Sequence, residues 1–208
     1  MKDNVIITIG RQYGSGGREI GIKLAKRLEI PFYDSNLVSM AAKELGITEQ
    51  EARKADEKAL SSFLSSYIVG PGDYTAYMNG DDEMRPLGER VYAAQSELIR
   101  QLADRSPCVI VGRCADYILQ EYSRLVTVFV YADKDERIAR VAELGRMPEK
   151  RAADRIKKID RQRRYYYETN TGGEWGVPET YQIFLNSGLT GISRAVDILE
   201  GVFEGMCR

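Results

Sequence analysis

A glycine-rich loop between a buried strand and a helix most constrains how this chain folds. Residues 5–9 (Val-Ile-Ile-Thr-Ile) are β-branched throughout, which is typical of a strand buried on both faces. Residues 10–17 contain four glycines, and residues 18–28 carry apolar side chains at helical spacing. A short second strand is expected at 31–34. The start of the chain therefore predicts a βαβ unit with parallel strands and a right-handed crossover.

The rest of the chain continues to alternate helices with strands. Further strands are predicted at 108–111, 126–132 and 181–185. Residues 35–69 are expected to be largely helical, with an amphipathic helix at 37–45. Further helices are predicted at 89–103, 117–122, 134–144, 148–167 and 192–203. Residues 170–178 are expected to form a loop. This alternation predicts an α/β fold with a mainly parallel sheet.

Two local patterns refine the segment between the second and third strands. Thr48 followed by Glu51 forms a capping-box pattern at the start of a helix. Residues 70–89 are rich in Gly, Pro and Asp, which favours a mobile insertion loop.

Composition excludes several classes of function. The chain has no histidine, which excludes a histidine general base, a Ser-His-Asp triad and histidine metal sites. Its net charge of -1 argues against binding nucleic acid through bulk charge. No apolar run reaches the roughly 18 residues that a membrane span needs. Three cysteines fit neither a disulfide framework nor a zinc site, so we expect no protein metal site and a cytoplasmic location.

The glycine loop has the features of a phosphate-binding site. Glycines allow successive backbone N–H groups to point into one concavity. The N-terminus of the following helix adds about half a unit of positive charge. Together these features predict an anion site at residues 14–18.

Two nucleotide-binding patterns compete for this loop. In the P-loop pattern G-x-x-x-x-G-K-[ST], Gly16 takes the second glycine position, Gly17 stands where lysine belongs, and Arg18 stands where Ser or Thr belongs. Arg18 would then supply the phosphate-binding cation from one residue further along.

The alternative is a Rossmann-type dinucleotide site. Its G-x-G-x-x-G pattern would begin at Gly14 and Gly16, but Glu19 stands at the third glycine position. Asp34 lies close to where a ribose-binding acid is expected. The loop by itself leaves both patterns open.

A basic segment follows later in the chain. Between Arg146 and Arg164 there are nine Lys or Arg residues against three Asp or Glu residues. Because the whole chain is nearly neutral, this segment is a concentrated positive patch.

Several motifs, in this order, resemble those of the cytidylate-kinase-like proteins, which belong to the P-loop nucleoside monophosphate kinase superfamily. The motifs that carry the resemblance are residues 9–21, 31–34, 109–116, 128–132, 160–167 and 181–187. The resemblance implies a single three-layer P-loop domain over residues 1–208, with a mainly parallel sheet, a helical monophosphate-binding insertion and an arginine-rich lid. It places the core at 1–34, 104–145 and 179–208, the insertion at 35–103 and the lid at 146–178.

The resemblance also implies an activity and a set of site residues. The activity is ATP-dependent phosphorylation of a nucleoside monophosphate, similar to CMP or dCMP, with ATP and Mg²⁺ as cofactors and small nucleotides as the partners. The donor phosphates would lie against Gly14, Ser15, Gly16, Gly17 and Arg18. The acceptor would contact Asp34, Arg113 and Asp160, and the catalytic cations would be Arg18, Arg161, Arg163 and Arg164, with Arg155 as a further lid candidate.

Three alternatives stay open at this stage. Because residue 17 is a glycine and not the P-loop lysine, the protein could bind a nucleotide with weak or no kinase activity. A Rossmann-type oxidoreductase would instead bind NAD, with Asp34 on the ribose. A kinase for a different small phosphate acceptor would share the same motifs.

Overall fold

The computed structural model describes residues 4–58 and 86–207. The chain divides into two compact units, one formed by Met1–Asp34 with Arg100–Arg208 and the other by Ser35–Ile99. No helix among the described residues is long and apolar enough to cross a membrane.

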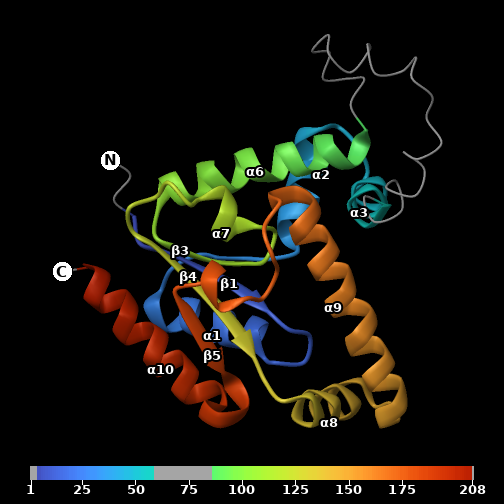
Figure 1. Cartoon of the computed structure of the whole chain (residues 1–208). Coiled ribbons are helices and arrows are strands. Elements are labelled where there is room, and N and C mark those ends of the chain that lie inside the picture. Colours follow the sequence, from blue (N-terminus) through green and yellow to red (C-terminus); the bar gives the residue numbers. More distant parts are fainter. Residues whose placement is uncertain (1–3, 59–85, 208) are drawn as a thin grey trace. The chain divides into compact units, whose positions relative to one another are not determined.

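The first unit is built on a five-stranded parallel sheet, shown in Figure 1. The strands are β1 (Ile6–Arg11), β2 (Phe32–Tyr33), β3 (Cys108–Val111), β4 (Leu125–Tyr131) and β5 (Ile183–Asn186). Their order is β2-β3-β1-β4-β5. This order differs from the Rossmann order, in which the second strand lies directly beside the first. The predicted α/β class with a parallel sheet is confirmed.

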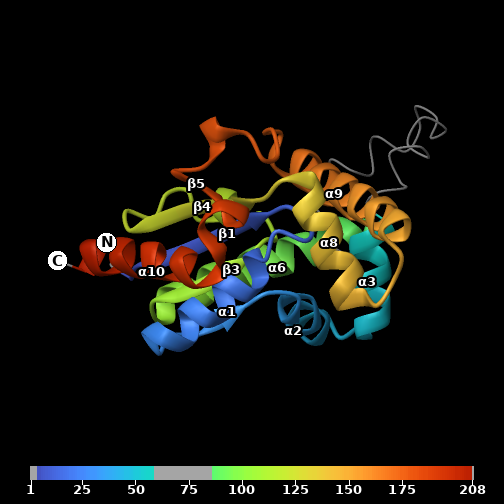
Figure 2. The same cartoon turned by 90° about the horizontal axis from the view of Figure 1, so that it is seen from below.

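Two helices pack side by side on one face of this sheet, α1 (Gly17–Leu28) and α10 (Ser187–Cys207) (Figures 1 and 2). The shared core is aliphatic, and it includes Ile9, Val128, Leu24 and Leu199, all with no exposed surface. The prediction of a final helix from residue 192 was close, because Gly191 with φ 68° interrupts α10 just before that point.

The predicted loop at residues 10–17 starts later than expected. β1 continues through Gly10 and Arg11, which pair with Phe129 and Val130 of β4. A Cβ at Gly10 would lie 2.8 Å from a ring carbon of Phe129 and 2.9 Å from the Tyr181 hydroxyl oxygen. This glycine therefore permits close packing of aromatic rings against the strand, and the loop itself spans residues 12–16.

The remaining helices of the first unit follow β3 and β4. They are α7 (Ala115–Ile118), α8 (Lys134–Gly145), α9 (Glu149–Thr171) and a short 3₁₀ turn at Pro178–Thr180. The predicted helix at 117–122 was wrong, since the helix ends at Ile118. Tyr122 ends the following turn, where its N–H donates to the Leu119 carbonyl at 2.8 Å and its buried hydroxyl donates to Asp104 at 2.6 Å. The chain is thereby directed into β4 instead of continuing as helix.

The second unit contains α2 (Asn36–Glu44) and α3 (Glu49–Lys58), and α6 (Leu87–Arg105) runs from it into the first unit. The Thr48–Glu51 capping box is confirmed, with Thr48 N–H donating to Glu51 Oε2 at 2.9 Å and Glu51 N–H donating to Thr48 Oγ1 at 3.2 Å. The predicted mobile loop at 70–89 was wrong at its end, because residues 87–89 start α6 after Pro86. Residues 59–85, including the rest of that loop and the end of the helical stretch at 35–69, lie outside the described residues.

Candidate phosphate site at the glycine loop

The loop between β1 and α1 depends on two glycines with left-handed backbone conformation. Gly14 has φ 86° and Gly16 has φ 79°, a region that side chains with a Cβ rarely adopt. A Cβ at Gly16 would also lie 2.4 Å from Ile192 Cδ1 of α10. The loop therefore turns sharply into α1 only because these positions are glycine.

The turn leaves a set of backbone amides without protein acceptors. Within the described residues, no acceptor is paired with the N–H groups of Gly14, Gly16, Gly17 or Arg18. The Ser15 N–H makes only a long contact of 3.4 Å to the Gln12 carbonyl. Unpaired amides at a helix N-terminus form an anion-binding site.

Side chains hold this loop in shape. The buried Ser15 hydroxyl lies 2.9 Å from the Gln12 carbonyl and 3.0 Å from the Val130 carbonyl. The Ser187 hydroxyl, at the start of α10, lies 2.5 Å from the Ser15 carbonyl and 3.0 Å from the Tyr131 carbonyl. The Ser15 hydroxyl thus serves the loop's structure, and a ligand would meet the backbone instead.

Helix α9 contacts the loop through charged side chains. Asp160 Oδ1 accepts a hydrogen bond from the Tyr13 N–H at 2.6 Å, and Asp160 Oδ2 pairs with Arg137 of α8 at 2.7 Å. Arg163 donates to the Arg11 carbonyl at 2.9 Å, and its guanidinium lies 5.5 Å from the centre of the Tyr13 ring. These contacts tie the middle of α9 to the end of β1 and to the loop.

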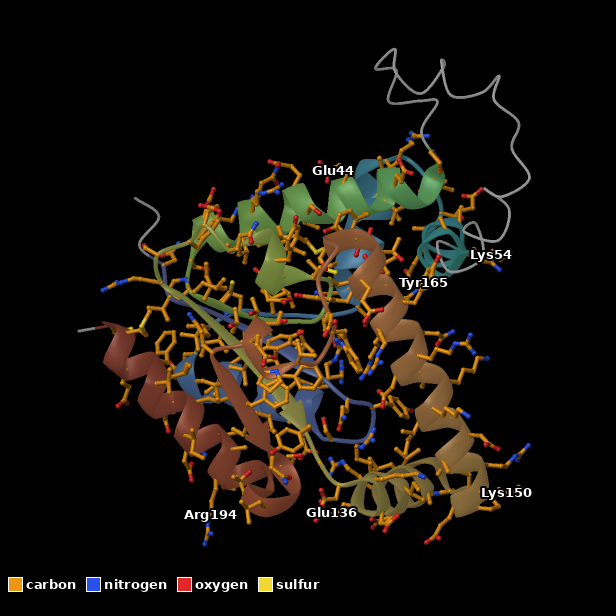
Figure 3. All side chains as sticks on the ribbon, viewed as in Figure 1. Glu44, Lys54, Glu136, Lys150, Tyr165 and Arg194 are labelled. Carbon is orange, nitrogen blue, oxygen red and sulfur yellow. The ribbon has the colours of Figure 1, made fainter. Side chains whose placement is uncertain are left out.

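The other predicted lid arginines are exposed on α9. Arg155 lies 5.7 Å from the Tyr13 ring centre and Arg164 lies 6.0 Å from the Trp175 ring centre, while Arg161 is exposed. Figure 3 shows Lys150 near one end of α9, pointing outward, and Tyr165 towards the other end. The basic segment is therefore divided between side chains that contact the loop and side chains that face solvent.

A second strained turn follows β3. Gly112, Arg113 and Cys114 all have positive φ, at 79°, 62° and 54°. For residues other than glycine this conformation costs about 1–2 kcal/mol each, and such strain is concentrated at functional sites. The Arg113 guanidinium lies 5.4 Å from the centre of the Tyr166 ring of α9.

The carboxylate at the end of the second strand is already paired. Asp34 is buried, and its Oδ2 lies 2.5 Å from Nε of Arg18. The Arg18 side chain is 62% exposed and its guanidinium lies 6.0 Å from the Phe32 ring centre. The structure thus joins one predicted donor-site residue to one predicted acceptor-site residue.

The family of the chain follows from its match to a family model. The model for the cytidylate kinase-like family matches residues 6–189, most of the chain. The chain belongs to the cytidylate kinase-like family. The comparison with curated proteins gives no match.

Solved structures agree with the fold of a P-loop kinase. An uncharacterized protein from Eubacterium ventriosum is 27% identical, with a TM-score of 0.71 over 97% of this chain and 99% of that chain. Shikimate kinase from Bacteroides thetaiotaomicron is 16% identical, with a TM-score of 0.51 over 96% of this chain and 98% of that chain. The family and the fold together support a kinase-type phosphotransferase.

For this cytidylate kinase-like protein, the sequence patterns did not single out one cation beside the loop. Arg11, the last residue of β1, lies beside the loop, and its Nε is buried without a hydrogen-bond partner. Burial lowers the pKa of its guanidinium well below the usual value, and the positive charges of Arg163 and Arg113 lower that pKa further. A charged residue ending an otherwise apolar strand, directly before the glycine loop, was the available sequence signal.

Two further side chains brace the first turn of α1. Glu19 forms ion pairs with Lys23 and with Arg140 of α8. The hydrogen bond from Lys23 is the largest cause that lowers the pKa of Glu19, and Arg140 acts in the same direction. Lys23 and Arg140 thus hold the Glu19 carboxylate beside the glycine loop.

The donor groups present are compatible with Mg²⁺ that arrives with a nucleotide. No group of three or more Cys, Asp or Glu side chains that could hold a metal ion exists among the described residues. Mg²⁺ commonly keeps several waters and is bound by substrate phosphates with one or two carboxylates. The site fits a nucleotide-bound ion better than a metal cage formed by the protein.

Proposed function

We propose that this protein transfers the γ-phosphoryl group of ATP to a nucleoside monophosphate of the CMP or dCMP type, giving the diphosphate. The observation that carries the proposal is the set of unpaired amides of Gly14, Gly16, Gly17 and Arg18, together with the cluster of the Arg11, Arg113 and Arg163 side chains. Phosphoryl transfer depends mainly on positioning and on positive charge around the reacting phosphate, and it needs no histidine.

The donor side of the site would be mostly backbone. The amides of Gly14, Gly16 and Gly17 would bind the phosphates of ATP, and Ser15 would keep the loop in the shape that this binding requires. Bound Mg²⁺ would neutralise phosphate charge. Arg18 would stand at the edge of the donor site, with Asp34 as its partner.

The acceptor side would use the residues after β2 and β3. Arg113 is proposed to bind the acceptor phosphate through its planar guanidinium. Asp34 is proposed to lie near the acceptor as well, and this role is supported by its burial at the same edge of the sheet. Asp160 is also proposed to serve the acceptor side, by holding the glycine loop in place through its hydrogen bond with the Tyr13 N–H.

The lid arginines would complete the positive environment. Arg163 already contacts the backbone of Arg11, whereas Arg161 and Arg164 are exposed. We assign these last two to the transferred phosphoryl group when nucleotides are bound, where they would also exclude water. Arg161→Ala and Arg164→Ala should then lower kcat and leave the unfolding temperature nearly unchanged.

An activity panel tests the proposed function. The protein is mixed with ATP, Mg²⁺ and either CMP, dCMP, UMP, AMP or GMP, and the diphosphate product is quantified by chromatography. Product with CMP or dCMP is expected. ATP binding without product from any monophosphate would favour a nucleotide-binding protein or a kinase for another phosphate acceptor, and binding of NAD instead of ATP would favour a dinucleotide site.

A further inference from the structure

The side chain of Arg11 packs directly against Gly17 and Gly112. A side chain at either glycine would collide with it. A Cβ at Gly17 would lie 2.7 Å from Arg11 Cβ, and a Cβ at Gly112 would lie 2.0 Å from Arg11 Nη1. Gly17 is the first residue of α1 and Gly112 follows β3. The Arg11 side chain therefore leaves β1 beside the first residue of α1, and its guanidinium lies beside Gly112.

Strand pairing explains how the side chain reaches this place. β1 pairs with β3 only as far as Ile9 and Val111, whereas its pairing with β4 continues to Arg11 and Val130. Beyond Ile9, β3 no longer flanks β1, and the chain after β3 turns away at Gly112. The space left at this edge of the sheet contains the Arg11 side chain.

The same contacts account for the missing lysine. In a P-loop, the residue in the position of Gly17 is the lysine that reaches the β- and γ-phosphates. A lysine there would place its Cβ against Cβ of Arg11, at a distance that real side chains do not show. In this backbone a side chain at residue 11, such as that of Arg11, therefore excludes any side chain at residue 17, lysine included.

The charge of Arg11 is only partly offset by the protein. Its Nε is buried and makes no hydrogen bond, and its nearest charged neighbours include Arg113 and Arg163. Asp34 is the carboxylate that acts on it, and Asp34 is already paired with Arg18. A half-buried guanidinium whose Nε makes no hydrogen bond and whose charge is only partly offset is costly, so the arrangement is expected to bind an anion.

We propose that the Arg11 guanidinium replaces the P-loop lysine and binds phosphate oxygens of the nucleoside triphosphate donor at the start of α1. This inference rests on the proposed function in one respect, namely that the donor is ATP. A guanidinium at this place can form two parallel hydrogen bonds to a phosphate, which an ammonium group cannot.

The other candidate for this role is Arg18. Its side chain points to the Asp34 carboxylate, is mostly exposed and lies near the Phe32 ring. The two arginines therefore differ in environment, and variants can separate them. Lys26, exposed on the last turn of α1, provides a charge-matched control.

The first experiment measures the Kd of ATP with Mg²⁺ by calorimetry for wild type and for Arg11→Met, Arg18→Met and Lys26→Met. Arg11→Met should raise Kd at least tenfold, about 1.4 kcal/mol, whereas Lys26→Met should stay within twofold. Arg11→Met should also unfold at the same or a higher temperature without ligand, because an unbalanced buried charge is removed. An Arg11→Met Kd within twofold of wild type, or a larger loss for Arg18→Met, would overturn the proposal.

The second experiment moves the cation back to the lysine position. Arg11→Gly and Gly17→Lys should each weaken ATP binding at least tenfold, the first by removing the cation and the second by the collision with Arg11. The double variant should recover most of the lost affinity, because glycine at 11 removes the contacts at 2.7 and 3.2 Å and leaves only the contact of 3.2 Å with Val130 Cβ, which a small shift can relieve. A double variant that binds ATP no better than Arg11→Gly would refute the replacement.

These results are separable from the proposed function. If wild type binds ATP but makes no diphosphate from any monophosphate, the proposed reaction fails while the Kd comparison still decides the role of Arg11. A wild type that does not bind ATP would overturn both.

Discussion

The glycine loop and the middle of α9 lie in contact, and they are stabilised in opposite ways. The loop is held by the hydroxyl groups of its own Ser15 and of Ser187 from α10, and several of its backbone amides remain without acceptors. In α9, Asp160 and Arg163 are engaged with Arg137, Tyr13 and the Arg11 carbonyl. The loop thus offers free backbone amides, whereas Asp160 and Arg163 of α9 contact the loop and the end of β1 and hold them in place.

The largest effect is expected from a side chain in the loop itself. Gly16→Ala would force a residue with a Cβ into φ 79° and against Ile192, so kcat/KM for ATP should fall at least 100-fold. Gly172→Ala is the matched control, since Gly172 has φ 69° at the end of α9 but no atom within 4 Å of its added Cβ. Steady-state kinetics of both variants test this contrast, and equal losses would show that the loop has no special role.

A smaller effect is expected at the turn after β3. Arg113→Ala should raise the KM of the acceptor at least tenfold and change the KM of ATP much less, because Arg113 is proposed to bind the acceptor phosphate. Both constants are obtained from initial rates with one substrate varied at a time. An equal rise in the KM of the acceptor and the KM of ATP would contradict a specific role of Arg113 in acceptor binding.

Asp160 tests the positioning role of α9. Asp160→Asn keeps the shape but weakens hydrogen bonds to Tyr13 and Arg137, so the unfolding free energy should fall by about 1.5–3 kcal/mol. The Kd of ATP should rise only about threefold. Asp154→Asn, at an exposed position on the same helix, should change neither quantity. Denaturant unfolding and calorimetry measure the two effects, and a large loss of affinity at unchanged stability would contradict the positioning role.

The smallest effect concerns another contact of α9, in which the Tyr167 hydroxyl donates to Asp116 at 2.7 Å. Burial, the largest cause, raises the pKa of Asp116, and the hydrogen bond from Tyr167 partly opposes this. The folded protein thus binds this proton more tightly than the unfolded chain does. The contribution of protonated Asp116 to the stability of the fold is present below its pKa in the unfolded chain. It is lost as pH rises through the pKa of Asp116 in the folded protein.

Asp116→Asn removes that titration. The unfolding free energy of the variant should therefore improve relative to wild type as pH rises from about 4 to about 7. Denaturant unfolding at several pH values measures the difference. Parallel curves for the two proteins would show that Asp116 keeps an ordinary pKa.

Much of the fold was predictable because it depends on local patterns. The β-branched run of β1 and the aliphatic run of β3 specify buried strands, and the Thr48–Glu51 pair specifies a helix start. The glycines at 14 and 16 mark the turn whose backbone conformation they permit. Errors arose where distant residues decided the outcome, as at Tyr122, whose hydroxyl reaches Asp104.

The candidate site was predictable in its loop and less so in its cations. Sequence spacing directs attention to Arg18, which follows the glycines, whereas the structure pairs Arg18 with Asp34. The place of Arg11 depends on where β3 stops pairing with β1 and on the absence of a Cβ at Gly112, a residue about one hundred positions away. No pattern within the loop contains that information.

Local patterns in the sequence specify an α/β chain with a glycine turn after its first strand, because β-branched runs, glycine and helical periodicity act over a few neighbouring residues. Which arginines gather near that turn and which remain exposed on α9 depends on how distant parts of the chain pack together. The reason is physical: a guanidinium's charge state and reach depend on the burial, pairing and free space supplied by residues from several separate strands and helices.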